Sequence, residues 1–147
     1  MIIQTIAGIF ERELQTLKAE IMLYADETSL WHVEEGINNS AGNLCLHLVG
    51  NLNHFIGAIL GNSGYIRNRD LEFSAHNYSR LELISALENT KTVVKNTFQL
   101  LSDADLKKDY PVEKHGEIVK TDFMLLHLLT HFNYHLGQIN YHRRLLG

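Results

Sequence analysis

Apolar residues recur at three- and four-residue steps in four stretches of the chain, the spacing that places them on one face of an α-helix. The stretches cover residues 2–25, 40–61, 79 to about 101, and 121 or 122 to about 145. Ser40 and Ser79 stand where helix caps are expected, and Glu82 completes a capping-box pattern with Ser79. Four such helices predict an all-α protein, a four-helix bundle that forms a single domain over residues 1–147.

Two polar links separate these helices. The link over residues 102–120 contains Pro111 and Gly116 among apolar residues, which favours a short irregular hairpin. The link over residues 61–78 contains four charged residues in a short run: Arg67, Arg69, Asp70 and Glu72. This run is either a solvated loop or an ion-pair network over one end of the bundle.

The side of the second helix that faces away from its apolar stripe carries small residues, among them Gly50 and Gly57. Glycine lowers helix propensity, so another segment is expected to pack closely against that side. On the first helix, Glu13 and Glu20 belong to a charged set that indicates a solvated face.

Composition narrows the class of protein. The chain is 45% hydrophobic and 20% charged, which is typical of a globular domain. A net charge of −4 argues against a nucleic-acid partner. No apolar run is long enough to span a membrane, and the early acidic residues argue against a signal peptide. The lone cysteine, Cys45, is expected to be a small buried hydrophobe. We therefore expect a cytoplasmic protein.

Histidines are concentrated on two of the predicted helices. The last helix carries His127, His131, His135 and His142, which lie with Tyr134 and Gln138 within roughly a quarter to a third of its circumference. His131 and His135 lie at the edge of the buried stripe, whereas His127 and His142 are better explained as boundary residues. The second helix adds His47 and His54. One upstream histidine with the pair makes three nitrogen ligands, and three protein ligands with an open position are typical of a catalytic divalent metal site.

Three blocks of sequence carry a family resemblance: H-F-N-Y-H-L-G-Q-I-N-Y-H-R-R-L, N-L-C-L-H-L-V-G-N-L-N-H-F-I-G and R-D-L-E-F-S. They resemble the DinB-like superfamily of metalloenzymes, and more narrowly a small uncharacterised branch of it, over nearly the whole chain. The resemblance implies an up-up-down-down four-helix bundle with a long crossover, commonly dimeric. It also implies a nickel, zinc or iron ion held by His47, His131 and His135, with His54 as a replacement or support for His47.

Two functions follow as hypotheses. The first is a metal-dependent enzyme, either a transferase that uses a low-molecular-weight thiol and a small-molecule substrate or a hydrolase. No carboxylate is expected beside the histidines to act as a general base, which favours the thiol reaction. His54 and His127 are candidate proton carriers or supporting residues, while Tyr134 and Gln138 are candidates for orienting a ligand. The second hypothesis is a non-catalytic helical dimer or ligand-binding module with a structural or incidental metal.

Overall fold

The computed structural model describes residues 1–147 and is entirely helical, with no strand. The α-helices are α1 (Ile2–Leu23), α2 (Ala41–Leu52), α3 (Arg69–Ser74), α4 (Arg80–Gln99) and α5 (Thr121–Leu146). Shorter helical turns are η1 (Glu27–Trp31), η2 (Asn53–Ala58) and η3 (Asp105–Lys107). The predicted all-α class is confirmed, and the four longer helices correspond to the four predicted stretches.

Local sequence explains how two of the longer helices begin. The Ser40 hydroxyl accepts a hydrogen bond from the Asn43 amide, and Ser79 forms the predicted capping box with Glu82. The α5 helix differs, because Lys120 occupies the capping position and supplies no side-chain cap. The second predicted helix is divided, since α2 continues beyond Leu52 as a wider π-helical turn, η2.

Contacts at the helix ends establish that α1 and α4 are antiparallel and that α1 and α5 are parallel. At one end of the molecule, the amide of Ile3 in α1 donates to Asp103, just beyond α4, at 3.0 Å. At the other end, Arg80 at the start of α4 donates to the carbonyl of Tyr24, just beyond α1, at 2.7 Å. The side chain of His142 near the end of α5 also contacts Tyr24, at 2.7 Å.

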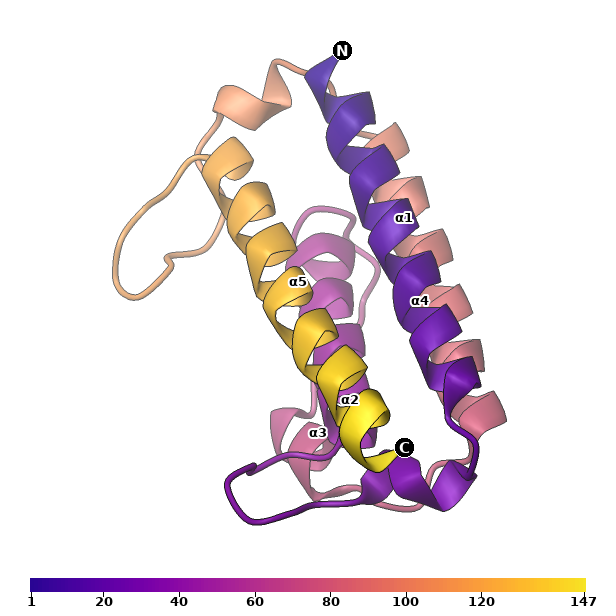
Figure 1. Cartoon of the computed structure of the whole chain (residues 1–147). Helices are drawn as coiled ribbons and strands as arrows, with labels where there is room; N and C mark the ends of the chain where they lie inside the picture. Colours follow the sequence, from indigo (N-terminus) through magenta and orange to yellow (C-terminus); the bar gives the residue numbers. More distant parts are fainter.

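The direction of α2 completes the topology. Gly42 at the start of α2 lies against Trp31 of η1, which directly follows α1, so α2 runs back antiparallel to α1. The order is therefore up-down-down-up, and the crossover over residues 59–79, which includes α3, joins the parallel helices α2 and α4 (Figure 1). The up-up-down-down order expected from the resemblance is wrong, because η1 and the following loop reverse the chain immediately after α1.

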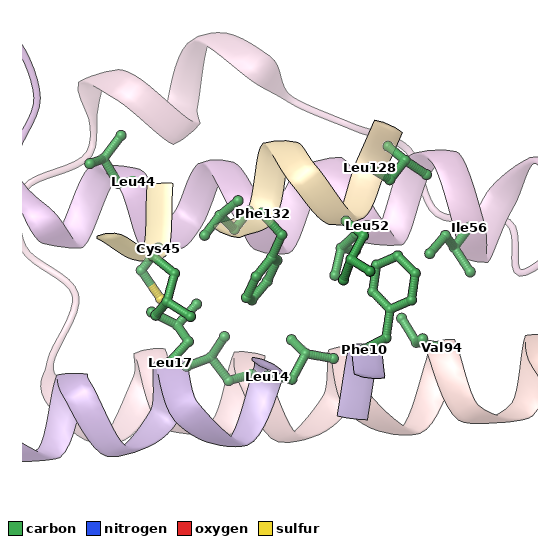
Figure 2. Packing of buried hydrophobic residues seen from close by; sticks show 14 of the residues in the cluster. Phe10, Leu14, Leu17, Leu44, Cys45, Leu52, Ile56, Val94, Leu128 and Phe132 are labelled. Atoms are coloured by element: carbon green, nitrogen blue, oxygen red, sulfur yellow. The ribbon is translucent and has the colours of Figure 1, made fainter. Parts of the chain in front are cut away.

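The four longer helices surround one hydrophobic core. Helix α1 packs against α4 and α5, and α2 packs against the same two helices. Figure 2 shows Phe10, Leu52 and Phe132, from three different helices, pointing into this core. Cys45 is fully buried there, as expected, and burial raises the pKa of its thiol to about 12.

The two links behave differently. The segment over residues 102–120 forms two isolated antiparallel β-bridges, Asp109 with Lys120 and Lys114 with Glu117. The predicted irregular hairpin is therefore present as two bridges and contains no regular β-strand. The other link contains α3, which the hydrophobic pattern did not predict. Helix α3 packs against α2. The side-chain amide of Asn43, in α2, donates to the backbone carbonyls of Glu72 at 3.0 Å and Ala75 at 2.6 Å. None of the helices combines the length and the hydropathy that a membrane span requires.

Candidate metal centre

Three histidine side chains converge between α2 and α5. One ring nitrogen from each of His47, His131 and His135 lies within 4.8 Å of the other two. Nε2 of His47 and Nε2 of His131 lie 3.1 Å apart. His131 and His135 are neighbours because residues four apart on a helix lie on the same face. These are the three residues expected from the resemblance, and the fold brings them together.

The rings meet at steep angles. The three ring planes are inclined to one another by 75° to 88°, with centroids 4.7 to 5.2 Å apart. The three imidazole rings are therefore not stacked on one another. This arrangement lets nitrogen lone pairs point at a common position, which stacked imidazoles would not allow.

Burial favours the metal-binding protonation state of two of the three histidines, His47 and His131. His47 is buried, and desolvation, together with the charges of His135 and Arg67, gives it a lowered pKa although Glu72 acts in the opposite direction. Desolvation and the neighbouring His135 and His47 together lower the pKa of His131 to about 4. Imidazole binds metal as the neutral base, so both rings are ready to act as ligands near neutral pH.

A buried carboxylate contacts Nδ1 of His47, the ring nitrogen that does not face His131. Oε1 of Glu72, on α3, lies 3.0 Å from Nδ1 of His47. Arg67 contacts both oxygens of the same carboxylate, through Nε at 2.8 Å and Nη2 at 3.0 Å. A carboxylate therefore lies beside the histidines, contrary to expectation, but both of its oxygens are already engaged by Arg67 and His47. Of the two interpretations of the charged run, the ion-pair network applies to Arg67 and Glu72, while Arg69 and Asp70 are exposed.

One sequence signal did point toward this carboxylate. Gly50 lies on the side of α2 that was predicted to receive a closely packed segment. A Cβ atom at this position would overlap the carboxylate of Glu72. The pattern of small residues thus predicted the close approach, but it did not identify α3 as the segment involved.

The other upstream histidine, His54, lies outside the cluster. It belongs to η2, and its ring packs against that of Phe55, with centroids 4.7 Å apart. Desolvation and the positive charge of Arg67 lower the pKa of His54. His47, rather than His54, is therefore the residue of the second predicted helix that joins the α5 pair.

The candidates on α5 fall into separate environments. Gln138 contacts the cluster directly, with its side-chain oxygen 2.7 Å from Nδ1 of His135. Tyr134 is exposed, and its ring centroid lies 5.3 Å from that of His135. His127 stacks on Phe123 outside the cluster, and desolvation together with Lys114 lowers its pKa.

The fourth histidine of this helix, His142, is structural. Its Nδ1 lies 2.7 Å from the hydroxyl of Tyr24, and its Nε2 lies 2.9 Å from the carbonyl of His32. Both ring nitrogens therefore have partners within the protein, which leaves neither free to bind a metal. This agrees with its interpretation as a boundary residue.

The donor set fits a divalent transition metal. Three imidazole nitrogens converge, and both oxygens of the adjacent carboxylate are already engaged by Arg67 and His47. Imidazole ligands suit zinc, nickel and iron, whereas magnesium and calcium require oxygen donors. In addition, Nδ1 of His131 is buried without a hydrogen-bond partner, so the polar groups of the cluster are not fully satisfied by the protein alone.

Comparison with known families covers almost the whole chain. The profile of the family described as "Protein of unknown function (DUF1572)" matches residues 3–147. No curated protein matches the sequence significantly.

Proposed function

The chain belongs to this DUF1572 family, and we propose that it is a metal-dependent enzyme whose divalent ion is bound by His47, His131 and His135. The observation that carries the proposal is the convergence of three imidazole nitrogens, contributed by α2 and α5, within 4.8 Å of one another. Three nitrogen ligands leave a coordination position for water or substrate, as catalytic sites do.

We also propose that the chain is a member of the DinB-like superfamily and that its metal is zinc, nickel or iron. The H-x-x-x-H-x-G-Q block places two of the converging histidines on α5, and His47 from α2 completes the set. The arrangement of four longer helices around one core supports the same relationship.

Transfer of a small thiol to an electrophilic substrate is the reaction that the surrounding residues support best. A divalent ion at such a site promotes deprotonation of the water or thiol that it binds. Glu72 is not available as a general base for hydrolysis, because it lies behind His47 with both oxygens engaged. Neutral His54 and His127 are the candidate acceptors for the thiol proton, and Tyr134 and Gln138 lie where they can orient a substrate.

Metal binding by the untagged protein tests the site. We expect one Zn²⁺ or Ni²⁺ per chain in elemental analysis. Replacing any one of the three ligands by alanine should remove most of this binding while the helical circular dichroism is retained. His76→Ala is the matched control, because His76 is exposed and lies outside the cluster. Equal metal content in all variants would refute the site.

Turnover with the zinc- or nickel-loaded protein tests the reaction. Low-molecular-weight thiols are offered with a chromogenic electrophile such as an activated aryl halide, and product formation is followed by absorbance. Activity should require the metal and disappear in His135→Ala. Absence of turnover for every combination of thiol and metal would contradict the transferase assignment.

A non-catalytic module is the second candidate, and one observation favours it. The cluster bridges α2 and α5, so a bound ion would cross-link two helices and stabilise the folded state. This alternative predicts that metal removal lowers the melting temperature and that no substrate pair is turned over.

We further propose that the protein acts as a homodimer. The exposed side of α5 carries large apolar side chains: Phe123, Leu126, Tyr134 and Tyr141. Exposed apolar side chains on one element are typical of surfaces that associate. Analytical ultracentrifugation should give a mass twice that of the monomer. The substitution Tyr141→Asp should lower the measured mass toward that of the monomer.

A further inference from the structure

The Arg67–Glu72 ion pair directly contacts His47, one of the three converging histidines. The side chains of Glu72 and His47 are each 6% exposed, and that of Arg67 is 11% exposed. Oε1 of Glu72 accepts from Nη2 of Arg67 at 3.0 Å and faces Nδ1 of His47 at 3.0 Å. A buried ion pair of this kind needs hydrogen bonds at each remaining polar position, and His47 supplies one.

The chemistry of the partners determines where the proton of His47 lies. A carboxylate in a two-point ion pair with arginine is a hydrogen-bond acceptor, so Nδ1 of His47 must donate. Nη2 of Arg67 also approaches Nδ1, at 3.4 Å, but guanidinium nitrogens only donate, and the shorter contact to Glu72 decides the tautomer. The lone pair of His47 is consequently on Nε2, the nitrogen that lies 3.1 Å from His131.

Neither of the α5 histidines has a comparable partner. Nδ1 of His131 is buried without a hydrogen-bond partner. Nδ1 of His135 contacts only the amide of exposed Gln138, which can present either its oxygen or its nitrogen after a side-chain flip. His47 is therefore the one ring in the cluster whose tautomer and orientation the protein holds before a metal arrives.

The packing of α3 on α2 serves this contact. Gly50 follows His47 by three residues on α2, and any Cβ atom there would overlap the Glu72 carboxylate. Asn43, one turn before His47, holds the α3 backbone through its hydrogen bonds to the carbonyls of Glu72 and Ala75. Two positions that flank His47 are thus adapted to bring Glu72 against it.

We propose that Glu72, aligned by Arg67, is the positioning residue of this metal centre. It holds His47 with the proton on Nδ1 and the lone pair of Nε2 facing the other two ligands. The inference rests on the proposed metal site and adds a residue that touches neither metal nor substrate. Loss of a carboxylate that orients a histidine ligand typically weakens metal binding about 10- to 100-fold.

Zinc affinity measured by competition with a chromogenic chelator tests the proposal. Glu72→Gln keeps the shape of the side chain and removes its charge, and it should weaken Zn²⁺ binding about 10- to 100-fold. Asp70→Asn is the matched control on α3, because Asp70 is exposed and should leave the affinity unchanged. Wild-type affinity in folded Glu72→Gln would overturn the role of Glu72.

The outcome also separates this proposal from the metal site itself. Loss of zinc binding in His47→Ala with full binding in Glu72→Gln would leave the site standing and refute the role of Glu72. Equal zinc binding by the wild type and His47→Ala would refute the site, and with it this inference.

A second measurement does not depend on the folding of any variant. Nitrogen-15 chemical shifts of the His47 ring in zinc-free wild-type protein distinguish a protonated from an unprotonated ring nitrogen. We expect Nδ1 to be protonated and Nε2 to be bare. A ring with its proton on Nε2 would overturn the proposal whatever the variants do.

Discussion

His131 and His142 occupy the same helix, yet their imidazoles have opposite surroundings. Both nitrogens of His142 have partners, the Tyr24 hydroxyl and the His32 carbonyl. In His131, Nε2 instead lies 3.1 Å from Nε2 of His47, and Nδ1 has no hydrogen-bond partner. At the scale of single residues, hydrogen-bond partners rather than residue type separate a structural histidine from a candidate ligand.

Removing the Tyr24 hydroxyl should destabilise the protein without affecting metal binding. Because Nε2 of His142 donates to the His32 carbonyl, its Nδ1 accepts from Tyr24, and Tyr24→Phe leaves that buried acceptor unpaired. We expect a loss of about 1–3 kcal/mol in the free energy of unfolding, measured with urea. Exposed Tyr65→Phe is the control, and an unchanged urea midpoint in Tyr24→Phe would contradict this assignment.

At the scale of the helices, α2 contains glycines, Gly42 and Gly50, where neighbouring side chains leave no space for a Cβ atom. In an ordinary helix, alanine is more favourable than glycine by about 1 kcal/mol. At Gly50 this preference is opposed by the Glu72 carboxylate, which occupies the space that a Cβ atom would need. At Gly8 on α1 nothing lies within 4 Å of the added atom, so the helix preference is unopposed.

Two glycine substitutions should therefore have opposite effects. Gly8→Ala should raise the free energy of unfolding by up to about 1 kcal/mol. Gly50→Ala should lower it by about 1–3 kcal/mol through overpacking, and should also weaken Zn²⁺ binding because Glu72 is displaced from His47. Urea unfolding and chelator competition check the pair. A stabilised Gly50→Ala with normal zinc affinity would show that α3 moves aside freely.

At the scale of the whole molecule, the parallel helices α1 and α5 are joined by a polar contact at their C-terminal ends. Glu20 accepts from Arg143 at 2.6 Å and from Asn140 at 2.8 Å. Glu20 and Glu13 are buried, so the interpretation of their helix face as solvated is wrong for these two residues. The Glu20 contact arises from the tertiary packing of α5 on α1.

This contact predicts a pH dependence of stability. Burial raises the pKa of the Glu20 carboxyl group, but hydrogen bonds from Arg143 and Asn140 and the charge of Arg143 outweigh it, so the net pKa is lowered. A carboxyl group with a lowered pKa in the folded state stabilises the protein above its unfolded pKa, and this contribution is lost as the pH falls through the folded value.

Glu20→Gln should therefore be less stable than the wild type at pH 7, by about 1–3 kcal/mol. The difference should shrink as the pH falls below the ordinary pKa of a glutamate carboxyl group and through the lowered pKa of Glu20 in the folded state. Urea unfolding between pH 7 and pH 3 measures this. Exposed Glu35→Gln, which lacks an ion pair, should show neither effect. A difference that is independent of pH would contradict the ionic role of Glu20.

Features that depend on neighbours along the chain could be predicted from the sequence. Helical periodicity and capping residues located the four longer helices, and a spacing of four residues placed His131 and His135 on one face of α5. Family resemblance, not periodicity, selected His47 over His54.

Features that join distant segments of the chain depend on the tertiary structure and could not be predicted in this way. The direction of α2 depends on the turn at η1, and the approach of Glu72 to His47 depends on α3, a helix of six residues with no useful hydrophobic period. The spacing of apolar residues along a helix predicts which face of the helix is buried, but not which segment packs against that face. That choice depends on the packing of the whole chain, so the carboxylate behind His47 became visible only in the folded molecule.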